Sequence, residues 1–491
     1  MAVVEEHERR ENPGSGHSLR WIEIAQGGVA GLVIVLLVAV VLFAYRGGAL
    51  AAFLEPSPPD VIIIVVADAL RADRLSCYTQ CPADGYTANR TPHIDALARD
   101  GVLYRDMNAP AAWTKPSVAT ILTSLYPSTH RACGYKHILP DEVLTLPEIL
   151  ATRGYHTVGF VANIYLFHEL NFHQGYAEYY DLDPLESSFY HKGDRCYQEA
   201  ELVNWRVLPW LEANCDQGSP SGGQGSSSGG RRSPSGDKRF FMYLHYMDPH
   251  GPYFVHPYDG RSYYCTDPSM AKLQSDVYDG EIAYFDRHFG NLIATLKRLG
   301  LYDDALIVFT SDHGEEFYEH QGWAHGKTLY QEITSVPLIV KYPGNVRAGT
   351  VDEGLARSLD IAPTILDVAG VEPPAAMRGV SLRLPPDSPA RAQFSFAEDF
   401  CLSKVMALRT PRYKLIEVIG GDRRGREPTQ LYDLAADPGE TTNLAATRPD
   451  LVARLRADMS QTLALAERAA VGGQEVDLSP AFMERLRQLG Y

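Results

Sequence analysis

The stretch Val61-Ile62-Ile63-Ile64-Val65-Val66-Ala67-Asp68 decides the fold of this chain. An unbroken run of β-branched residues is typical of a strand that is buried on both faces, as strands of parallel sheets are. A second apolar run, residues 306–310, leads into Asp312 and His313. In open α/β sheets, functional side chains lie beyond the carboxyl ends of the strands. We therefore expect Asp68, Asp312 and His313 to lie close together.

The rest of the chain alternates apolar runs with helical stretches. We expect helices over residues 91–101, 117–125 and 277–299, and strands over residues 157–161, 240–244 and 336–341. This alternation predicts an α/β domain whose central sheet is mostly parallel and is flanked by helices.

The predicted catalytic domain spans residues 60–385. A Gly/Ser/Pro-rich insertion at residues 216–236 interrupts it and is expected to be disordered. A smaller C-terminal α+β subdomain is expected over residues 386–491. Its expected strands and helix are residues 394–397, 404–408, 413–418 and 450–469.

An uncharged, apolar run at residues 27–45 is long enough to cross a bilayer as a helix. It predicts a transmembrane signal anchor over residues 22–46, after a cytoplasmic tail of residues 1–21. A Pro-rich linker over residues 47–59 would follow. A cleaved signal peptide is the alternative, although the run is long for one and no clear cleavage site follows it.

Basic residues around this segment predict its orientation. Arg9, Arg10 and Arg20 precede it, and only Arg46 follows closely. Because Lys and Arg are retained on the cytoplasmic side, the N-terminus is expected in the cytoplasm. The catalytic domain is then expected in the periplasm or outside the cell.

Composition excludes one class of partner. The formal net charge is −16, whereas nucleic-acid binding needs a basic face. Basic residues cluster only at Arg231-Arg232 and at Arg423-Arg424-Gly425-Arg426. Nucleic acid is therefore not an expected partner.

The run Trp113-Thr114-Lys115-Pro116-Ser117 begins a predicted helix. Pro116 fits the first turn, which places Thr114 at or just before the cap, where free N–H groups favour an anion. A hydroxyl that is bound there to a metal loses its proton easily and attacks phosphorus or sulfur. Taken alone, Thr114 could be a simple cap. Together with two carboxylates and an imidazole, it predicts a one-metal site whose ligands are Asp68, Thr114, Asp312 and His313.

Further motifs follow in order along the chain. They are Asp68-Ala69-Leu70-Arg71-Ala72-Asp73-Arg74-Leu75, Thr91-Pro92-His93-Ile94-Asp95, Thr114-Lys115-Pro116-Ser117, Asp248-Pro249-His250-Gly251-Pro252, Thr310-Ser311-Asp312-His313-Gly314-Glu315 and Leu431-Tyr432-Asp433-Leu434. On these motifs the chain resembles the sulfatase family of the alkaline phosphatase superfamily.

The resemblance implies site roles. Asp68, Asp312 and His313 resemble the metal ligands of the family, and Thr114 occupies the nucleophile position and is a ligand too. His250 resembles a histidine that holds a substrate oxygen or protonates the leaving group. The catalytic residues that the resemblance implies are Thr114, His250, His325 and Lys327.

One divalent metal ion is implied as the cofactor. A two-metal site needs a further late histidine, and none follows His325. Ala69 replaces a second acidic ligand, and His313 adds a nitrogen. These changes favour Zn²⁺ or Mn²⁺, with Ca²⁺ or Mg²⁺ as alternatives.

The chain differs from the family pattern at positions that affect the reaction it can catalyse. Thr114 stands where sulfatases usually carry the Cys or Ser that becomes formylglycine. Threonine does not undergo that conversion, and a sulfo-threonine lacks the elimination step that releases sulfate. Val118 replaces an Arg, and a Lys-x-His pair is missing near Asn163, which could contact the substrate instead.

Threonine nucleophiles occur in relatives that cleave or transfer phosphate esters. We therefore expect hydrolysis of phosphate mono- or diesters of small molecules, lipids or glycans. The alternatives are a sulfuric ester hydrolase (a sulfatase), a transferase that moves a phospho-head-group to a lipid or glycan, and a catalytically dead binding protein.

Overall fold

The computed structural model describes residues 57–79, 91–182, 200–215, 239–257, 261–391, 394–399, 405–419 and 426–488. Residues Pro58–Tyr491 form one compact unit. The predicted tail, the anchor at residues 22–46 and the insertion at residues 216–236 lie outside the described residues. None of the helices in the described ranges is long and apolar enough to cross a membrane.

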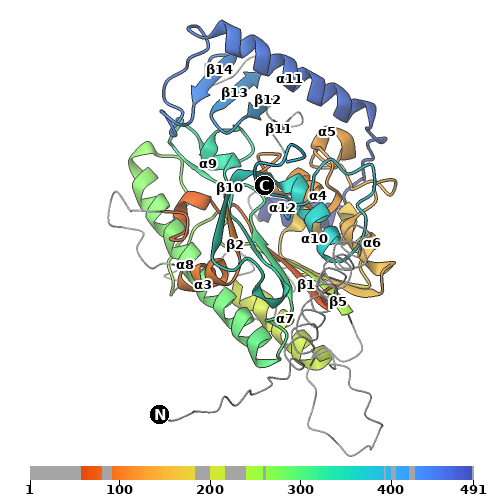
Figure 1. The fold of residues 1–491 in the computed structure, drawn as a ribbon. Helices are drawn as coiled ribbons and strands as arrows, with labels where there is room; N and C mark the ends of the chain where they lie inside the picture. Colours follow the sequence, from red (N-terminus) through yellow and green to blue (C-terminus); the bar gives the residue numbers. More distant parts are fainter. Residues whose placement is uncertain are drawn as a thin grey trace, which may run out of the picture. The chain divides into compact units, whose positions relative to one another are not determined.

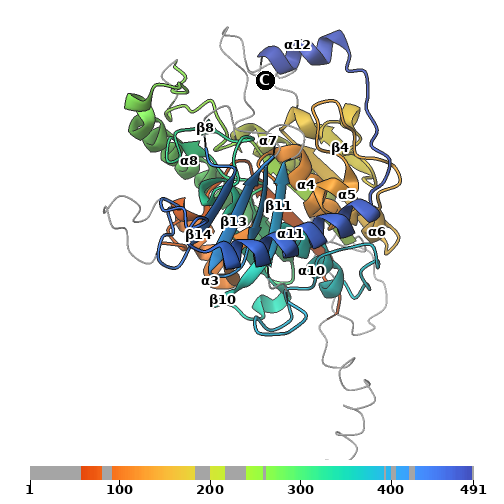
Figure 2. The same ribbon diagram turned by 90° about the horizontal axis from the view of Figure 1, so that it is seen from above.

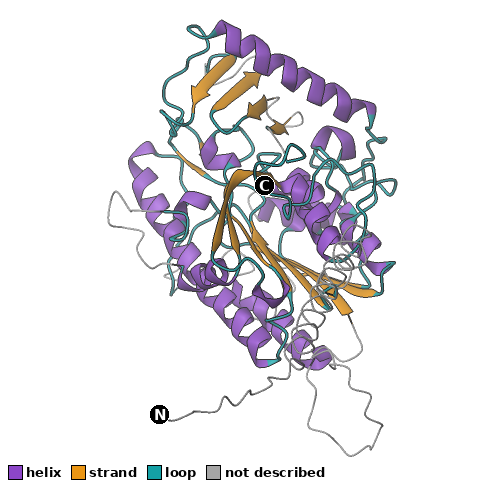
Figure 3. Ribbon diagram, in the orientation of Figure 1, coloured by secondary structure: helices purple, strands orange, loops and turns teal. Residues whose placement is uncertain are grey.

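An eight-stranded sheet forms the centre of this unit, in the order β10-β2-β9-β6-β1-β5-β3-β4 (Figures 1 and 3). Its strands are β1 (Val61–Ala67), β2 (Val102–Asn108), β3 (Tyr155–Val161), β4 (Glu178–Asp181), β5 (Arg239–Tyr246), β6 (Leu306–Thr310), β9 (Leu338–Lys341) and β10 (Thr350–Arg357). Only β9 runs antiparallel to its neighbours, β2 and β6. The mostly parallel sheet expected from the sequence is confirmed.

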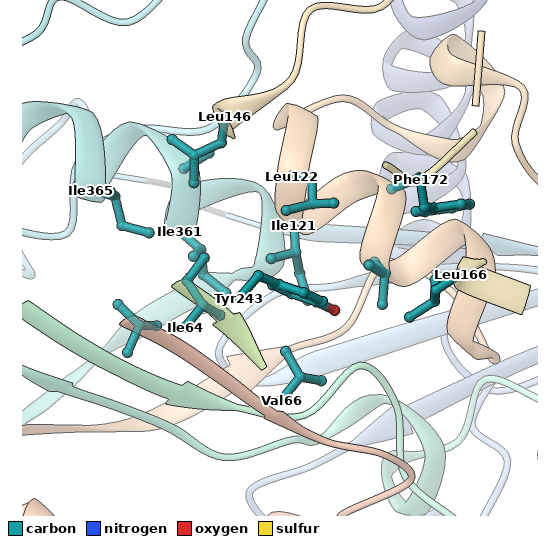
Figure 4. Close-up of a cluster of buried hydrophobic side chains, with 14 of the residues drawn as sticks. Ile64, Val66, Ile121, Leu122, Leu146, Leu166, Phe172, Tyr243, Ile361 and Ile365 are labelled. Atoms are coloured by element: carbon teal, nitrogen blue, oxygen red, sulfur yellow. The ribbon is translucent and has the colours of Figure 1, made fainter. Parts of the chain in front are cut away.

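Two apolar cores lie on opposite faces of this sheet, because successive side chains of β1 alternate between them. Val61, Ile63 and Val65 join α3 (Pro92–Asp100), α7 (Ala200–Cys215) and α8 (Ala271–Arg298). The other face carries α4 (Thr114–Thr123), α6 (Leu146–Ala151) and α10 (Ile361–Val368). Figure 4 shows Ile64 and Val66 among side chains of α4 and α10. Complete burial on both faces explains the unbroken apolar run of β1.

A second sheet of four antiparallel strands follows in the sequence. It comprises β11 (Ser395–Asp399), β12 (Val405–Arg409), β13 (Tyr413–Val418) and β14 (Thr429–Asp433). The helix α11 (Pro449–Arg468) packs across it through Leu451, Leu455 and Met459 (Figure 2).

After α11 the chain returns to the central unit. The amide of Val471 donates to the Thr129 carbonyl, and Val476 donates to the Lys136 carbonyl. Phe482 and Leu486 of α12 (Pro480–Gln488) join the core that contains α4. Residues 386–491 thus contribute to both parts, and the boundary near residue 385 stays a prediction.

Glu398 joins the C-terminal sheet to α5 (Pro127–His130). Its Oε1 accepts a hydrogen bond from the Ser128 amide at 2.6 Å, and the side chain is 1% exposed. Burial raises the pKa of Glu398 from 4.5 to about 7, although the Ser128 amide and Arg131 act in the opposite direction. The protonated carboxyl is therefore the form that the folded state stabilises.

Glu398→Gln is expected to flatten the pH dependence of stability. A carboxyl whose folded-state pKa is raised contributes stability below its unfolded pKa and loses it as pH rises through about 7. Between pH 5 and pH 8 the wild type should lose about 2–3 kcal/mol more unfolding free energy than Glu398→Gln. Urea unfolding at both pH values measures this difference. Glu372→Gln, an exposed control, should behave as the wild type, and equal losses in all three proteins would refute the assignment.

Candidate active site

Two buried carboxylates meet beyond the carboxyl ends of adjacent strands. β1 and β6 are parallel, with Val66 opposite Thr310, so the chain after each strand emerges at one edge of the sheet. Asp68 follows β1 directly, and Asp312 follows β6 by two residues; both are fully buried. The sequence prediction that these residues lie together agrees with this geometry.

Asp68 uses its two oxygens differently. Its Oδ2 accepts hydrogen bonds from Asn163 Nδ2 at 2.8 Å and from His245 Nε2 at 3.0 Å. Its Oδ1 is buried and has no hydrogen-bond partner among the described residues. Burial alone would raise the pKa of Asp68, but His250, His245 and His313 outweigh burial and lower that pKa. Asp68 is therefore ionised, with one oxygen left for another ligand.

The two oxygens of Asp312 also have different environments. Its Oδ1 accepts from the backbone amides of Ala69 at 3.2 Å and His313 at 3.0 Å. Its Oδ2 is buried without a hydrogen-bond partner in the described part of the chain. Ala69 has a φ of 59°, a left-handed conformation that is uncommon for a residue with a Cβ. The residue that replaces an acidic ligand thus contributes its backbone N–H.

His313 completes the set. Its Nδ1 donates to the Gly314 carbonyl at 2.9 Å, so Nε2 is the nitrogen that faces the carboxylates. Burial lowers the pKa of His313, but Asp312 and Asp68 outweigh burial and raise that pKa, so Nε2 would release a proton on binding a cation. Nε2 lies 3.4 Å from Asp68 Oδ1 and 3.5 Å from Asp312 Oδ2. The three side chains each offer a ligand atom, and these atoms lie within 4.8 Å of one another.

A divalent cation fits this arrangement. Two carboxylate oxygens that lack a hydrogen-bond partner among the described residues face a single point together with one imidazole nitrogen. Buried carboxylates need a counter-charge, and a cation bound at this point would provide it. A mixed oxygen and nitrogen donor set suits Zn²⁺ or Mn²⁺ better than Ca²⁺.

Thr114 lies beside these ligands as the first residue of α4, after the N-cap residue Trp113. Its Oγ1 is 3.3 Å from His313 Nε2, 3.3 Å from Asn163 Nδ2 and 3.5 Å from Asp68 Oδ2. The helix begins three residues before the start expected from the sequence. The hydroxyl therefore lies at a helix N-terminus, where negative charge is favoured.

Two further histidines adjoin the cluster. The His325 ring lies 4.2 Å from the His313 ring and 4.9 Å from that of His250, between centroids. His325 Nδ1 donates to Glu315 Oε1 at 3.1 Å. Burial, helped by His313, lowers the pKa of His325 and makes the ring neutral at neutral pH.

The fourth predicted catalytic residue, Lys327, follows β8 (Trp323–Ala324). Lys327 is exposed, and its Nζ donates to the Trp323 carbonyl at 3.2 Å. The structure brings Thr114, His250 and His325 around the predicted metal ligands. The functional roles of all these side chains stay predictions.

The sequence analysis did not predict His245 as a site residue, nor the contacts of Asn163 with Asp68 and Thr114. His245 is fully buried, and its Nδ1 accepts from or donates to Tyr243 Oη at 3.1 Å. Asn163 Oδ1 accepts from the Tyr165 amide, which turns its Nδ2 toward Asp68 and Thr114. The available signal was a histidine inside β5, whose other residues after Arg239 are apolar or aromatic.

A mostly parallel α/β sheet with a candidate cation site beside a buried hydroxyl is compatible with a metal-dependent ester hydrolase. The sulfatase profile matches residues 60–371, and the profile of the N-sulphoglucosamine sulphohydrolase C-terminal region matches residues 319–468. The chain belongs to the sulfatase family, within the alkaline phosphatase superfamily, and is a hydrolase of ester bonds. Members of this superfamily use a divalent metal.

Known proteins resemble the chain over most of its length. An N-acetylglucosamine-6-O-sulfatase of Bacteroides thetaiotaomicron is 22% identical, covering 78% of this chain and 82% of the relative. Human arylsulfatase A is 26% identical, covering 83% and 88%. The solved structure of a phosphonate monoester hydrolase from Silicibacter pomeroyi superposes with a TM-score of 0.64 at 24% identity, covering 82% and 94%. This last likeness concerns the fold.

Asn163→Ala is expected to weaken metal binding about 10–100-fold. The substitution removes the closest hydrogen-bond donor to Asp68 Oδ2, and the carboxylate is then no longer held in its orientation. Competition with a chromophoric chelator measures the affinity without relying on turnover. Asn204→Ala is the matched control: Asn204 is also buried, but it bonds Tyr246 and His288. Equal affinities of Asn163→Ala and Asn204→Ala would contradict the orienting role.

Proposed function

We propose that this protein hydrolyses phosphate mono- or diesters outside the cytoplasm, with Thr114 as the nucleophile. One observation carries the proposal: Thr114 Oγ1 lies 3.3 Å from His313 Nε2, at a helix N-terminus beside two carboxylates. Threonine stands where most sulfatases carry the residue that becomes formylglycine. It offers a hydroxyl that forms a phosphoester, but no aldehyde hydrate.

Asp68, Asp312 and His313 would hold the cation, with Thr114 adjacent. When bound, the cation would act as a Lewis acid that polarises a phosphoryl oxygen and lowers the pKa of a neighbouring hydroxyl. Asn163 donates to both Asp68 and Thr114, and so holds Oγ1 in place for attack. The N–H groups of the first turn of α4 would meet the charge of the transferred group.

The reaction would proceed in two steps. Thr114 Oγ1, its proton released to water, attacks phosphorus, and the bond from phosphorus to the alcohol oxygen breaks. The departing alcohol takes a proton from His250, whose Nδ1 is held by the Gly251 carbonyl at 2.6 Å. Water then attacks the phospho-threonine and breaks its Oγ1–phosphorus bond, which regenerates the hydroxyl.

A sulfuric ester hydrolase is the second candidate function. The family profile and the two sulfatase relatives favour it. Direct use of Thr114 would leave a sulfo-threonine, whose release would need attack by water at sulfur. Transfer of a phospho-head-group to an acceptor alcohol shares the first step of the proposed mechanism and differs only in the group that opens the intermediate.

Thr114→Ala should abolish turnover of the preferred substrate, by at least about a thousandfold, because the attacking oxygen is removed. Aryl phosphate, aryl phosphodiester and aryl sulfate are assayed with and without chelator. Mass spectrometry of rapidly quenched turnover should find one added phosphoryl group on the peptide that contains Thr114. Thr120→Ala, a buried threonine of the same helix, is the control. Aryl sulfate turnover that survives Thr114→Ala would overturn the proposal.

His250→Gln is expected to lower kcat about 10²–10⁴-fold on alkyl phosphoesters, because their alkoxide leaving groups need a proton. The loss should shrink on nitrophenyl esters, whose phenolate departs unprotonated, while bound metal stays unchanged. The control is His288→Gln, a substitution of a buried histidine of α8. Equal losses on both classes of ester would show that His250 does not serve the leaving group.

The placement outside the cytoplasm rests on the apolar residues 27–45 and on the basic residues that precede them. Protease added to cells whose outer envelope is permeabilised, with the cytoplasmic membrane intact, should digest the catalytic domain and leave the N-terminal tail protected. Protection of the catalytic domain in such cells, with digestion only after the cytoplasmic membrane is lysed, would reject this orientation.

A further inference from the structure

A short hairpin carries two of the side chains that lie beside the predicted metal ligands. It consists of β7 (Glu316–Phe317) and β8, which pair antiparallel, and of the turn between them. Glu315 precedes β7 and His325 follows β8, and the two side chains are joined by a hydrogen bond of 3.1 Å. We call residues 315–325 the hairpin. Because both of its ends lie at the site, its order determines where the His325 ring lies.

The hairpin needs contacts with the rest of the molecule to stay closed. Each strand contributes only two paired residues, and even longer isolated hairpins are marginally stable in water. Arg71 Nη1 holds one side, because it donates to the Glu315 carbonyl at 3.0 Å and to Glu319 Oε1 at 2.5 Å. Inside the turn, Glu316 Oε1 accepts from the His320 amide at 3.2 Å. The tip of the turn is held by the His320 side chain.

Both ring nitrogens of His320 face hydrogen-bond acceptors. Nδ1 lies 2.6 Å from Glu332 Oε1 in α9 (Gln331–Thr334), and Nε2 lies 3.1 Å from the Glu440 carbonyl. An ionised carboxylate and a carbonyl only accept, so both bonds form together only when the ring carries two protons. The ring also stacks on Tyr330 at 3.6 Å between centroids. The imidazolium therefore joins the hairpin to α9 and to the segment after β14.

The ionisable groups around the ring come from every element packed against it: the hairpin, α9 with the residue before it, the segment after β14, and β13. They are Glu316, Glu319, Tyr330, Glu332, Asp437, Glu440 and Lys414, with Arg71 and Arg426 farther out. Lys414 pairs with Glu440 at 3.1 Å, and Arg71 pairs with Glu319. Glu332 is buried and pairs directly with His320. The acidic groups outnumber the basic ones, which favours the imidazolium.

The pKa values of the two partners agree with an ion pair. Burial lowers the pKa of His320, but Glu332 and the Glu440 carbonyl outweigh burial and raise that pKa above its ordinary value of 6.5. Burial raises the pKa of Glu332, but His320 outweighs burial and lowers it. A histidine whose folded-state pKa is raised stabilises its contacts fully below 6.5, and this stabilisation is lost as pH rises through the folded-state value. The hairpin tip should therefore be held more tightly at pH 6 than in alkaline solution.

We propose that His320 is a proton-dependent lock on the hairpin that carries His325. When the ring holds two protons, it bonds both Glu332 and the Glu440 carbonyl, and the hairpin stays closed. When the ring loses one proton to solvent, one of the two bonds is lost and the hairpin opens more often. Opening would separate His325 from Glu315. The proposal concerns the order of this segment, so it stands whichever ester the enzyme cleaves.

Hydrogen–deuterium exchange on the full chain, followed by mass spectrometry from pH 5.5 to pH 9, tests the proposal. Rates are corrected for the intrinsic pH dependence of amide exchange. Protection of the peptide that covers residues 315–326 should be level below pH 6.5. From there up to the folded-state pKa it should fall about tenfold per pH unit, because each opening then releases one proton. A peptide from β1 is the internal reference and should keep its protection.

Three variants sharpen the test. His320→Gln keeps a donor but does not titrate, so its hairpin should be less protected at pH 6 and show no fall. Glu332→Gln removes the carboxylate that raises the pKa, so the total fall should shrink. His156→Gln is the matched control, because His156 also pairs with a glutamate, Glu178 at 2.5 Å, but lies on β3, and it should behave as the wild type.

The wild-type pH series decides the matter even if a variant does not fold. The proposal is overturned if the wild-type hairpin keeps level protection across the whole pH range. It is equally overturned if the β1 peptide loses protection in parallel, since the protein would then open as a whole, or if folded His320→Gln shows the same fall as the wild type.

Discussion

Two carboxylates are buried side by side, and the rest of the site must compensate for their negative charge. Asp68 and Asp312 each bind hydrogen-bond donors through one oxygen and direct the other toward the same point. Ionised carboxylates are tolerated in an interior only when hydrogen bonds and counter-charge compensate for lost water. Asn163, His245 and two backbone amides provide the hydrogen bonds. The remaining need for positive charge supports the predicted cation site.

The sheet provides the rigidity that this arrangement needs. Parallel pairing of β1 with β5 and β6 places Asp68 between His245 on one side and Asp312 on the other. Side chains on central strands are held more precisely than side chains on loops, and small displacements of a ligand weaken a metal site. Thr114 reaches the same point because α4 packs on that face of the sheet through Ile121 and Leu122.

The sequence predicted those elements whose signal is local. β1 and β6 could be identified because burial on both faces leaves a continuous apolar run. β2 was not predicted, because Arg105 and Asp106 interrupt its apolar pattern. Their ion-pair partners, Glu353 and Arg409, lie in distant segments of the chain. α8 starts at Ala271, before its apolar stripe, in a turn that carries the Lys272–Asp276 ion pair. Such pairs stabilise a helix without leaving a hydrophobic period.

The candidate site also contains residues that the sequence predicted and residues that it did not. Asp68, Asp312 and His313 come just after strands, so the rule that functional residues lie beyond the carboxyl ends of parallel strands predicted their proximity. Thr114 was added from its place at a helix start and from the family resemblance. The position of His245 depends on the register of β5 against β1, which no local pattern specifies. The packing of residues 471–476 beside α5 was likewise not predicted, because it depends on contacts between segments more than 300 residues apart.

Within the proposed phosphoester chemistry, the charged and neutral side chains around Thr114 favour one class of ester. The pKa of His325 is lowered by burial, so its ring is neutral, and Asn163 provides a neutral amide where the family pattern has a Lys-x-His pair. Lys327 directs its ammonium toward the Trp323 carbonyl. A phosphate monoester brings close to two negative charges into the site, whereas a diester brings one. With the cation as the main positive charge, and two carboxylates already beside it, a singly charged diester meets the smaller electrostatic penalty.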